Sequence, residues 1–449
     1  MKRKKRKSSG KSYFLKRLKR HVGGVDPATL AVIEQTFEPY QRANVHLAVE
    51  KLIGAPGVEA ELEGVLVEEE YHSVTLSKLA RDATARHVLA GPVEYHDIAI
   101  AGGKRLACVK RGLYWIDSKA TGPLVMLVHQ PPHSYPPKIR VDVMGRERDA
   151  AEDFARRLAS EVARAAAFRG QVLSLELGCQ HELEVHFHML PAIARDEIVL
   201  PEPVLSRIDR HAERFVRHAD ALRSAGRHLK RGILLHGSPG TGKTLCAMYL
   251  ASQMKGRTVI ILTGGGIASI ESAGRLARSL QPVTVILEDV DLIGTQREHQ
   301  SISANALLFE LLNQMDGLAE DADVLFVLTS NRPEILEPAL ASRPGRIDQA
   351  IEIPLPDEDC RRRLLELYSR GMTVQLDDAQ KIVQRTQGVS AAFIRELLRK
   401  AALFAADENG QAELIVRDAH VNAALDELTV HGGVLTRTLL GVSSPGPSA

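Results

Sequence analysis

Residues 232–244 read GILLHGSPGTGKT, an apolar run followed by a glycine-rich loop that ends in a lysine and a threonine. The loop fits the pattern G-x-x-x-x-G-K-[ST], in which backbone N–H groups curl around a phosphate. The apolar run predicts a buried strand, and the following LCAMYLASQM predicts a helix whose positive end faces the same phosphate. The stretch therefore predicts an α/β fold with a phosphate loop at the end of a parallel strand.

The residue types of this loop suit a nucleoside triphosphate that is bound together with Mg²⁺. Lys243 would bridge the β and γ oxygens, and the Thr244 hydroxyl would be a ligand of the metal. We therefore expect ATP and Mg²⁺ as cofactors. The candidate binding residues are Gly237, Ser238, Pro239, Gly240, Thr241, Gly242, Lys243, Thr244 and Leu245.

A second apolar strand, about forty residues further on, ends in acidic residues. The segment PVTVILEDVDLIG (282–294) runs into Glu288, Asp289 and Asp291. Hydrolysis at a phosphate loop needs carboxylates at this place, one for the metal and one that orients the attacking water. We predict that Glu288 lies toward Mg²⁺ and Asp289 toward the water. The alternative is a strand that ends in solvated acids.

Three further motifs follow in the order and spacing of a known family. They are LLNQMDGL (311–318), LTSNRP (328–333) and RPGRID (343–348). Together with the phosphate loop and the acidic strand, they resemble the AAA family of ATPases, within the AAA+ superfamily, over about residues 198–430. The resemblance implies a P-loop NTPase core with a parallel sheet at 196–357 and a helical lid at 358–430.

The resemblance also implies an assembly and further site residues. Such ATPases form rings, usually hexamers, with ATP bound between neighbouring subunits. Asn331 matches the polar residue that senses the γ-phosphate, while Arg343 and Arg346 match arginines that reach into the neighbour's site. Phosphoryl transfer spreads negative charge over the γ oxygens, and an arginine supplied in trans can be worth about 10³ to 10⁵ in rate. The alternative for both arginines is local pairing with acids such as Asp348.

The acidic strand and the lid depart from the family pattern. The family usually has Asp followed by Glu, whereas this chain has Glu288 followed by Asp289, an order similar to that of the Bcs1-like branch. Both side chains remain ionisable acceptors, so we predict an active ATPase that converts ATP and water to ADP and phosphate. In the lid, Ser-Ala-Ala at 390–392 stands where the family has Ser-Gly-Ala, which leaves the role of Arg395 open.

A further departure concerns the loop that faces the central pore in threading members of the family. They carry an aromatic residue and a glycine there, but this chain has no Phe, Tyr or Trp between Ile261 and Leu308. The bulky apolar candidates on the loop are Ile267 and Ile270. A weak grip on an unfolded polypeptide favours a folded or assembled client.

The residues before this core predict a separate domain. Residues 21–60 contain apolar residues at helical spacing, and alternating segments between 90 and 200 predict strands around one strong helix at 152–168. We therefore predict a mixed α/β amino-terminal domain over 23–195. Its sequence contains no motif that indicates a particular chemistry. A polar tail at 431–449 is predicted to be disordered.

The first 20 residues hold eleven of the chain's 58 Lys and Arg residues and no acid, although the whole chain has a net charge of only +2. We predict a basic disordered arm over 1–22. Such an arm could bind nucleic acid through phosphate contacts, or an anionic membrane surface through an apolar stripe of Phe14, Leu15 and Leu18. The other hypothesis is a solvated tail without a partner.

The segment HELEVH (181–186) is close to the zinc-protease signature H-E-x-x-H, but its spacing differs. The two histidines of that signature lie four residues apart on one face of a helix, whereas His181 and His186 lie five apart. Apolar and polar residues alternate from Leu183 to His188, which is the period of a strand. We therefore predict a strand here and no protease within this chain, while a separate protease partner is left open.

Composition limits the class of protein. With 44% hydrophobic and 25% charged residues, the chain has the composition of a folded soluble protein. No apolar run approaches the roughly 18 residues that a transmembrane helix needs. The four cysteines lie far apart, which indicates a reducing compartment, and we expect a cytoplasmic protein.

The motifs together favour a chaperone-like ring ATPase that remodels or disassembles protein clients, with the amino-terminal domain choosing the client. The alternative is a nucleic-acid-associated ATPase that holds DNA or RNA with residues 1–20. A small-molecule P-loop kinase would leave Asn331, Arg343 and Arg346 unexplained.

Overall fold

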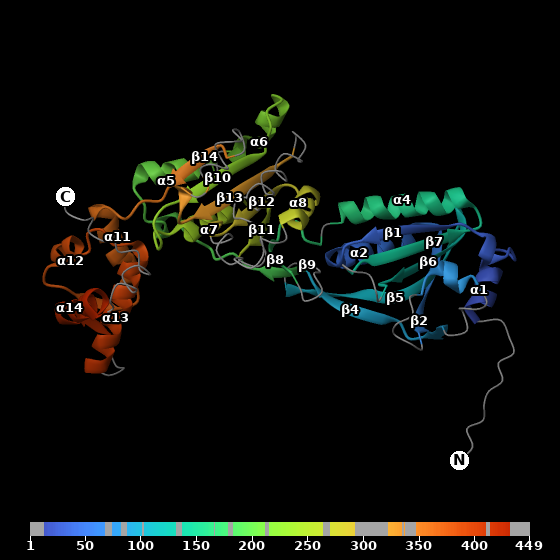
Figure 1. Cartoon of the computed structure of the whole chain (residues 1–449), viewed down its shortest axis with the longest axis horizontal. Coiled ribbons are helices and arrows are strands. Elements are labelled where there is room, and N and C mark those ends of the chain that lie inside the picture. Colours follow the sequence, from blue (N-terminus) through green and yellow to red (C-terminus); the bar gives the residue numbers. More distant parts are fainter. Residues whose placement is uncertain are drawn as a thin grey trace, which may run out of the picture. The chain divides into compact units, whose positions relative to one another are not determined.

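The computed structural model divides the chain into two compact units. Unit 1 comprises Met1–Arg169 with Leu175–Phe187, and unit 2 comprises Gly170–Ser174 with His188–Ala449. Figure 1 shows the elements of both. The residues that the structure describes are 13–67, 74–81, 88–100, 103–131, 137–165, 167–177, 183–211, 215–263, 270–291, 322–334, 336, 347–409 and 414–431.

Unit 1 is built on an antiparallel sheet. Its strands are β1 (Val32–Phe37), β2 (Val58–Val67), β3 (Val88–Gly91), β4 (Glu94–Ala99), β5 (Arg105–Ser118), β6 (Gly122–His129) and β7 (Ile139–Gly145). They are ordered β1-β7-β6-β5-β2-β3, and β4 lies beside β5. Most residues of β6 and β7 are buried, because helices cover both faces of the sheet.

Two apolar cores, one on each face of this sheet, stabilise unit 1. The helical segments are α1 (Tyr13–His21), η1 (Pro27–Thr29), η2 (Pro39–Gln41), α2 (Arg42–Ile53), α3 (Leu76–Leu79) and α4 (Arg148–Arg164). Side chains of a strand alternate between its faces. Accordingly, Leu124 and Met126 of β6 belong to the core with α2 and α4, whereas Val125 and Leu127 belong to the core with α1 and α3.

The prediction of helix over 21–60 is wrong in its first half. Val32–Phe37 forms strand β1, which pairs antiparallel with β7 over its whole length, and the helix α2 begins only at Arg42. A short apolar run does not distinguish a strand from a buried helical turn by its spacing. Pairing with a distant strand decides the outcome here.

The prediction of a disordered arm over 1–22 also needs correction. Tyr13–His21 forms α1, whose Phe14 and Leu18 side chains are fully buried against the sheet. Arg17 stacks on Trp115 at 4.4 Å and pairs with glutamates of β2. The apolar stripe that suggested membrane binding therefore belongs to the core of unit 1. Residues 1–12 and the predicted tail beyond 431 lie outside the described residues.

A second, mainly parallel sheet lies largely in unit 2. Its strands are β8 (Val172–Leu177), β9 (Leu183–His188), β10 (Arg231–His236), β11 (Thr258–Leu262), β12 (Val283–Leu287), β13 (Val324–Ser330) and β14 (Gln349–Glu352), although the end of β8 and most of β9 belong to unit 1. The order is β14-β10-β13-β12-β11-β8-β9, and every ladder from β14 to β8 is parallel. All residues of β11, β12 and β13 are buried, as expected for parallel strands covered on both faces. The predicted P-loop α/β fold is confirmed.

The helices of this core lie along the sheet. They are η5 (Arg195–Glu197), α5 (Glu202–Asp209), α6 (Phe215–Ser224), α7 (Lys243–Gln253) and α8 (Ile270–Ser279). Side chains of α5 and α7 share one apolar core with the strands, and α8 packs against β12. Because β10, β13 and β12 are neighbours and run parallel, the phosphate loop, Asn331 and the acidic residues all emerge at the same edge.

A helical lid follows the sheet, as predicted. It consists of α11 (Glu358–Tyr368), β15 (Thr373–Gln375), α12 (Ala379–Arg385), α13 (Ala391–Asn409), β16 (Ile415–Arg417), α14 (Asp418–Asp426) and the π-helical turn η9 (Glu427–His431). Its apolar core contains Phe393 and Leu397 of α13, both without exposed surface.

The predicted boundary at 195/196 falls later in the chain than the structural one. The chain enters unit 2 first at Gly170, because residues 172–174 of β8 pair in parallel with 259–261 of β11. The segment GQVLSLELG thus supplies a strand to the P-loop sheet. The strand predicted for the HELEVH segment is confirmed as β9.

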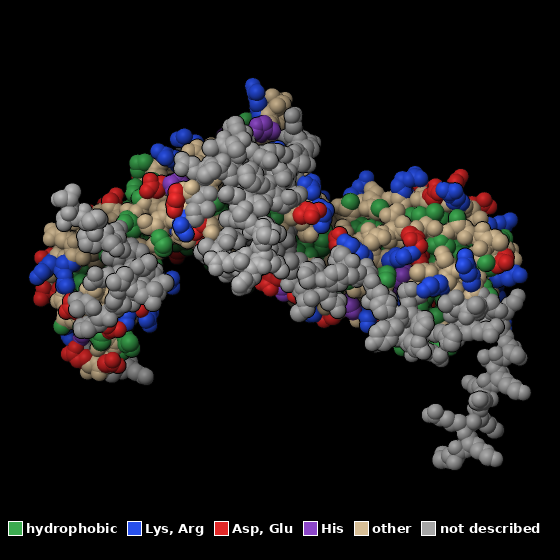
Figure 2. Space-filling view, viewed as in Figure 1, with side chains coloured by type: hydrophobic (Ala, Val, Ile, Leu, Met, Phe, Trp, Pro, Cys, Tyr) green, Lys and Arg blue, Asp and Glu red, His purple; other side chains and the backbone are tan. Residues whose placement is uncertain are grey.

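Charges of both signs are mixed on the described surface of unit 1. Figure 2 shows Lys and Arg side chains interspersed with Asp and Glu on the face of unit 1 that it presents. Among the helices that the structure describes, none has the length and apolar character needed to cross a bilayer. Cys108, Cys246 and Cys360 are buried free thiols.

Candidate active site

The phosphate loop has positive φ at three glycines, and at two of them, Gly237 and Gly240, there is also no room for a Cβ. Gly237 has φ +141°, and a Cβ there would lie 2.4 Å from the carbonyl oxygen of Ile353. Gly240 has φ +74°, and a Cβ there would lie 2.8 Å from the Ser390 hydroxyl. Both φ values lie in the region that residues with a Cβ avoid. The glycines thus allow the loop to fold tightly against β14 and against the lid.

Lys243 lies at the start of α7 with its ammonium turned back into the loop. Nζ donates to the carbonyl oxygens of Gly237 and Ser238 at 2.8 and 2.9 Å. Burial lowers the pKa of Lys243, and the carboxylates of Asp289 and Asp291 oppose that shift. The ammonium is therefore held where phosphate oxygens of a bound nucleotide would replace the two carbonyls as its partners.

Glu288 and Thr244 meet at the point where a metal ion is expected. The Thr244 hydroxyl lies close enough to the Glu288 carboxylate to lower its pKa, and Glu288 Oε1 is buried with no hydrogen-bond partner among the described residues. Burial raises the pKa of Glu288; the Thr244 hydroxyl opposes this rise, and the Asp289 carboxylate adds to it. A buried carboxylate oxygen without a donor suits a cation.

The residues present fit a Mg²⁺ ion that is bound together with a nucleotide. Within the described part of the chain, no three His, Cys, Asp or Glu side chains cluster as a metal site. Mg²⁺ bound with a nucleotide needs only one or two protein oxygens, because phosphates and waters complete its octahedron. Thr244 and Glu288 supply two such oxygens.

Asp289 and Asn331 form the second polar pair of the site. Asn331 Nδ2 donates to Asp289 Oδ1 at 3.1 Å, and both residues line the pocket described below. Asp291 is almost fully buried and accepts from the backbone N–H of Asn331 at 3.0 Å. Sequence reasoning gave Asp291 no role; the structure assigns it the task of holding the Asn331 backbone.

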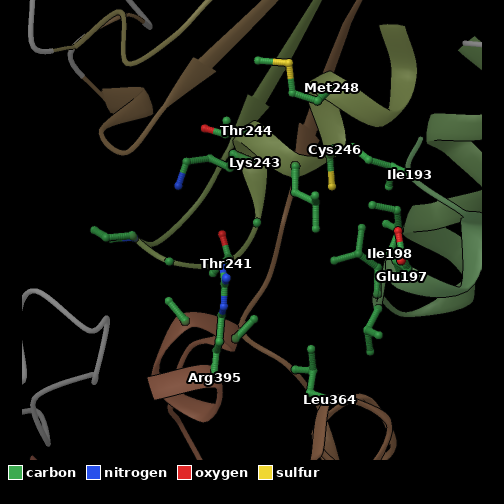
Figure 3. A pocket seen from close by; sticks show the side chains of 18 of the residues that line it. Ile193, Glu197, Ile198, Thr241, Lys243, Thr244, Cys246, Met248, Leu364 and Arg395 are labelled. Carbon is green, nitrogen blue, oxygen red and sulfur yellow. The ribbon is translucent and has the colours of Figure 1, made fainter. Parts of the chain in front are cut away.

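Lys243, Thr244, Asp289 and Asn331 line a cavity of about 550 Å³ between the core and the lid. Figure 3 shows Lys243 and Thr244 on one side, and Ile193 and Ile198 of the segment before α5 on another. Leu364 of the lid contributes a further apolar side chain. The cavity thus joins a polar phosphate end to an apolar end of the kind that suits a planar base.

The apolar wall at 191–200 was missed by sequence reasoning. Its residues Ile193, Ile198 and Leu200 are at most 7% exposed, yet no motif marks them. The only signal is a set of apolar residues in an irregular, proline-flanked segment just before a P-loop core.

The lid closes on the phosphate loop through its longest helix. The backbone N–H of Ala392, near the start of α13, donates to the carbonyl oxygen of Gly240 at 3.0 Å. One turn later Arg395 lines the cavity, together with Tyr368 of α11. Arg395, whose role the sequence left open, therefore lies at the nucleotide pocket; Figure 3 labels it on the lid helix.

Several predicted residues lie outside the described part of the chain. These are Arg343, Arg346, Ile267 and the motif LLNQMDGL. Ile270, the other predicted pore residue, is the first residue of α8 and is only 3% exposed, so the structure places it in the core and not on a pore loop.

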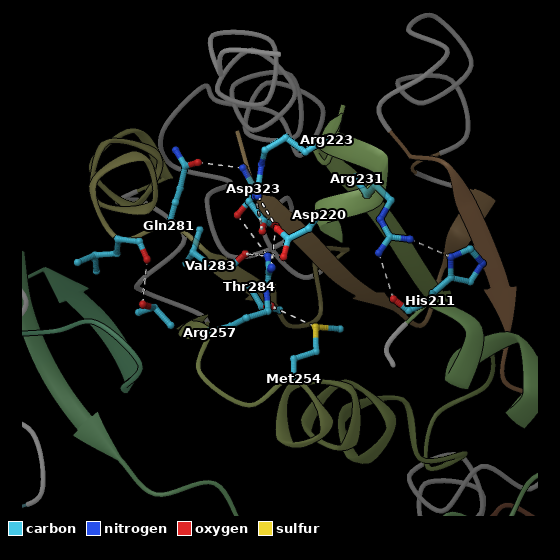
Figure 4. A network of polar contacts seen from close by, with 12 residues as sticks. His211, Asp220, Arg223, Arg231, Met254, Arg257, Gln281, Val283, Thr284 and Asp323 are labelled. Atoms are coloured by element: carbon cyan, nitrogen blue, oxygen red, sulfur yellow. Dashed lines mark hydrogen bonds and ion pairs between the residues drawn. The ribbon is translucent and has the colours of Figure 1, made fainter. Parts of the chain in front are cut away.

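A different polar network lies at the opposite edge of the sheet, before the strands begin. Arg257 precedes β11 and donates to Asp323 Oδ1 at 2.6 Å, to the Val283 carbonyl at 2.8 Å and to the Thr284 hydroxyl at 3.3 Å. Gln281 accepts from the Asp323 backbone N–H (Figure 4). These bonds tie together the amino ends of β11, β12 and β13.

Comparison with known proteins agrees with this geometry. Residues 233–355 match the family model described as "ATPase family associated with various cellular activities (AAA)", so this part of the chain is similar to an AAA domain. The match contains the phosphate loop, the acidic strand and Asn331, but nothing in it distinguishes the Bcs1-like branch.

The chain is also similar to curated proteins. It is 32% identical over 205 residues to the proteasome-activating nucleotidase of Pyrococcus horikoshii, covering 43% of this chain and 51% of that protein. It is 36% identical over 188 residues to the 26S proteasome regulatory subunit S10B homolog B of Arabidopsis thaliana, covering 39% and 47%. The chain thus spans about half the length of these relatives.

Proposed function

We propose that this chain is an ATP-hydrolysing ring ATPase that remodels or disassembles protein clients. The observation that carries the proposal is the convergence of Lys243, the Thr244–Glu288 pair and the Asp289–Asn331 pair at one end of a nucleotide-sized cavity. In this scheme Thr244 and Glu288 hold Mg²⁺, which neutralises phosphate charge, and Asp289 orients the attacking water.

Hydrolysis is proposed to occur at interfaces between subunits of a homo-oligomer, of which a hexameric ring is the expected form. The Asp289–Asn331 pair supplies an acceptor and a γ-phosphate sensor, but no described arginine other than Arg395 lines the cavity. Arg343 and Arg346 of the neighbouring subunit would supply the charge that stabilises the transferring phosphoryl group.

The client is proposed to be a protein, and unit 1 is proposed to select it. The relatives' names support a protein-directed role, since they are a proteasome-activating nucleotidase and a proteasome regulatory subunit. Unit 1 has its own two cores and supplies a separate folded surface. The free buried thiols of Cys108, Cys246 and Cys360 support a reducing, cytoplasmic location.

A trap variant tests this function. Asp289→Asn should bind ATP and lose hydrolysis by about 10²- to 10⁴-fold, so that clients stay bound to the nucleotide-loaded ring. Steady-state ATPase rates are measured first, followed by co-purification from native lysate with and without nuclease. Proteins retained after nuclease, and absent from a Lys243→Ala control that cannot hold the phosphates, support remodelling. A wild-type chain without Mg²⁺-dependent ATP hydrolysis would refute the proposed activity.

A nucleic-acid-associated role is the second candidate. Lys16, Lys19 and Arg20 are exposed on α1 and form no ion pair with another described residue, and residues 1–12 add seven Lys or Arg. Because α1 is part of the core, the test removes residues 1–12 only. Loss of a salt-sensitive DNA or RNA affinity in that variant would favour this role; unchanged binding would count against it.

A further inference from the structure

The residue that follows Glu288 has an unusual backbone. Asp289 has φ +48°, the only positive φ at a non-glycine position in the described chain. Left-handed backbone is sterically unfavourable for residues with a Cβ, but Asp and Asn adopt it more readily than Glu does. The reversed order of the two acids therefore places the tolerant side chain at the position where the backbone is left-handed.

One residue of the neighbouring strand holds this turn. Thr329 is fully buried in β13, and its hydroxyl accepts from the backbone N–H of Asp289 at 2.9 Å. The carbonyl oxygen of Thr329 accepts from the next backbone N–H, that of Val290, at 3.0 Å. Two successive amides of the turn thus end on the same residue, and the turn has little freedom to rotate.

The consequence is seen in the Asp289 side chain. With the backbone fixed in this way, the short carboxylate accepts from Asn331 Nδ2 and lines the nucleotide cavity. Asn331 follows Thr329 by two residues on the same strand end, so the residue that fixes the Asp289 backbone also leads directly into its side-chain partner. Backbone and carboxylate are both anchored to β13.

We propose that Thr329 is a positioning residue for hydrolysis: its hydroxyl holds Asp289 in the left-handed conformation that aims the carboxylate at the attacking water. The same conformation accounts for Asp, in place of the family's usual Glu, at this position. The proposal rests on the proposed ATPase function and concerns the orientation of Asp289, not the binding of nucleotide.

Thr329→Val tests the proposal in the full-length chain, because valine keeps the shape and removes the hydroxyl. The expected result is a kcat lower by about 10- to 100-fold, with the KM for ATP and the affinity for a fluorescent ATP analogue within about twofold of wild type. Thr329→Ser keeps the acceptor oxygen and should restore most of kcat. A Thr329→Val enzyme with wild-type kcat would overturn the proposal.

Thr284→Val is the matched control. Thr284 is also fully buried, on the adjacent strand β12, but its hydroxyl bonds Arg257 at the other edge of the sheet. Thermal unfolding should show a loss of stability in both valine variants, whereas kcat should fall only in Thr329→Val. An equal fall of kcat in both would mean that core packing, not positioning, controls the rate, and would overturn the proposal.

A second variant leaves the buried core unchanged. The exchange Glu288→Asp with Asp289→Glu restores the usual order of acids but puts Glu on a left-handed backbone. We expect nucleotide binding to be kept and kcat to fall at least about tenfold. Wild-type kcat in the exchanged enzyme would contradict the link between backbone and acid order. If the wild-type chain itself fails to hydrolyse ATP, the proposed function fails. This outcome is distinct from a wild-type kcat in Thr329→Val or in the exchanged enzyme, either of which would overturn only the role of Thr329.

Discussion

Buried charged residues at the two edges of the parallel sheet in unit 2 differ in whether they have hydrogen-bond partners within the chain. At the amino edge, the Arg257 guanidinium is almost completely buried and bonds a carboxylate, a hydroxyl and two carbonyls. At the carboxyl edge, Glu288 Oε1 is buried without a hydrogen-bond partner among the described residues, and Asp289 has a left-handed backbone. The Arg257 guanidinium thus finds all these partners within the chain, whereas Glu288 Oε1 finds none among the described residues.

This difference separates charged residues that stabilise the fold from charged residues that bind a ligand. Buried polar groups are normally hydrogen-bonded, and exceptions concentrate where a ligand completes the bonding. Ligands of open α/β sheets bind at the carboxyl ends of the strands. The unsatisfied Glu288 and the strained Asp289 therefore identify the working edge independently of any motif. Arg257 and Asp323 hold the same strands in register without taking part in the chemistry.

The largest expected effect concerns the arginine that a neighbouring subunit is proposed to supply to the site at the carboxyl edge. Arg346→Ala should bind ATP and lose hydrolysis by about 10³-fold or more, because in the proposed ring the neighbour's site would lose its trans arginine. Steady-state ATPase rates and nucleotide binding measure this. Arg362→Ala, which removes an exposed lid arginine paired with Glu358, is the control and should keep its rate.

Mixed rings of two variants test whether the site is shared between subunits. A mixed ring of Arg346→Ala and Lys243→Ala subunits contains some interfaces with one intact phosphate loop and one intact arginine. Part of the hydrolysis rate should therefore return on mixing, although neither variant is active alone. Mixtures that stay as inactive as the separate variants would argue that each chain completes its own site.

The next effect concerns the amino edge and should appear in stability alone. Asp323→Asn leaves the Arg257 guanidinium buried without its carboxylate, which typically costs about 3 to 5 kcal/mol in the free energy of unfolding. Chemical denaturation measures that cost, and kcat per folded molecule should stay near wild type. Arg275→Gln breaks an exposed pair with Glu271 and should cost less than about 0.5 kcal/mol. A large fall of kcat in folded Asp323→Asn would remove the distinction between the edges.

The sequence predicted the carboxyl edge better than the rest because its chemistry restricts residue types. A phosphate loop needs glycines and a lysine, and hydrolysis needs acids after a neighbouring strand, so Lys243 and Glu288 were found by spacing. The apolar wall around Ile198 needs only bulk and apolarity, which many sequences meet. No local pattern distinguishes it from an ordinary linker.

The errors in unit 1 have a related cause. Val32–Phe37 is a strand because β7 pairs with it, and Tyr13–His21 is a folded helix because the sheet buries Phe14 and Leu18. In both cases a partner far along the chain decides the structure. Local spacing and composition are silent about such partners, and the same limit moved the predicted boundary away from Gly170.

The smallest expected effect concerns Glu288 and its dependence on pH. Burial raises its pKa above the ordinary value of 4.5, Asp289 adds to the rise, and Thr244 opposes it. The folded state therefore binds this proton more tightly than the unfolded chain does. As the pH rises from the unfolded pKa through the folded one, stability is lost, and above both the ionised carboxylate is a cost.

Glu288→Gln should accordingly raise the unfolding temperature at pH 8 in the absence of nucleotide and Mg²⁺, and the difference from wild type should vanish near pH 4, where Glu288 is protonated in both states. Addition of Mg²⁺ and ATP should reverse the order at pH 8, because only the carboxylate stabilises the bound cation. Thermal scans at the two pH values measure both effects, with the exposed Glu271→Gln as control. A Glu288→Gln protein that is less stable than wild type at pH 8 without ligand would mean that the carboxyl edge is already satisfied within the chain, and the contrast with Arg257 would not hold.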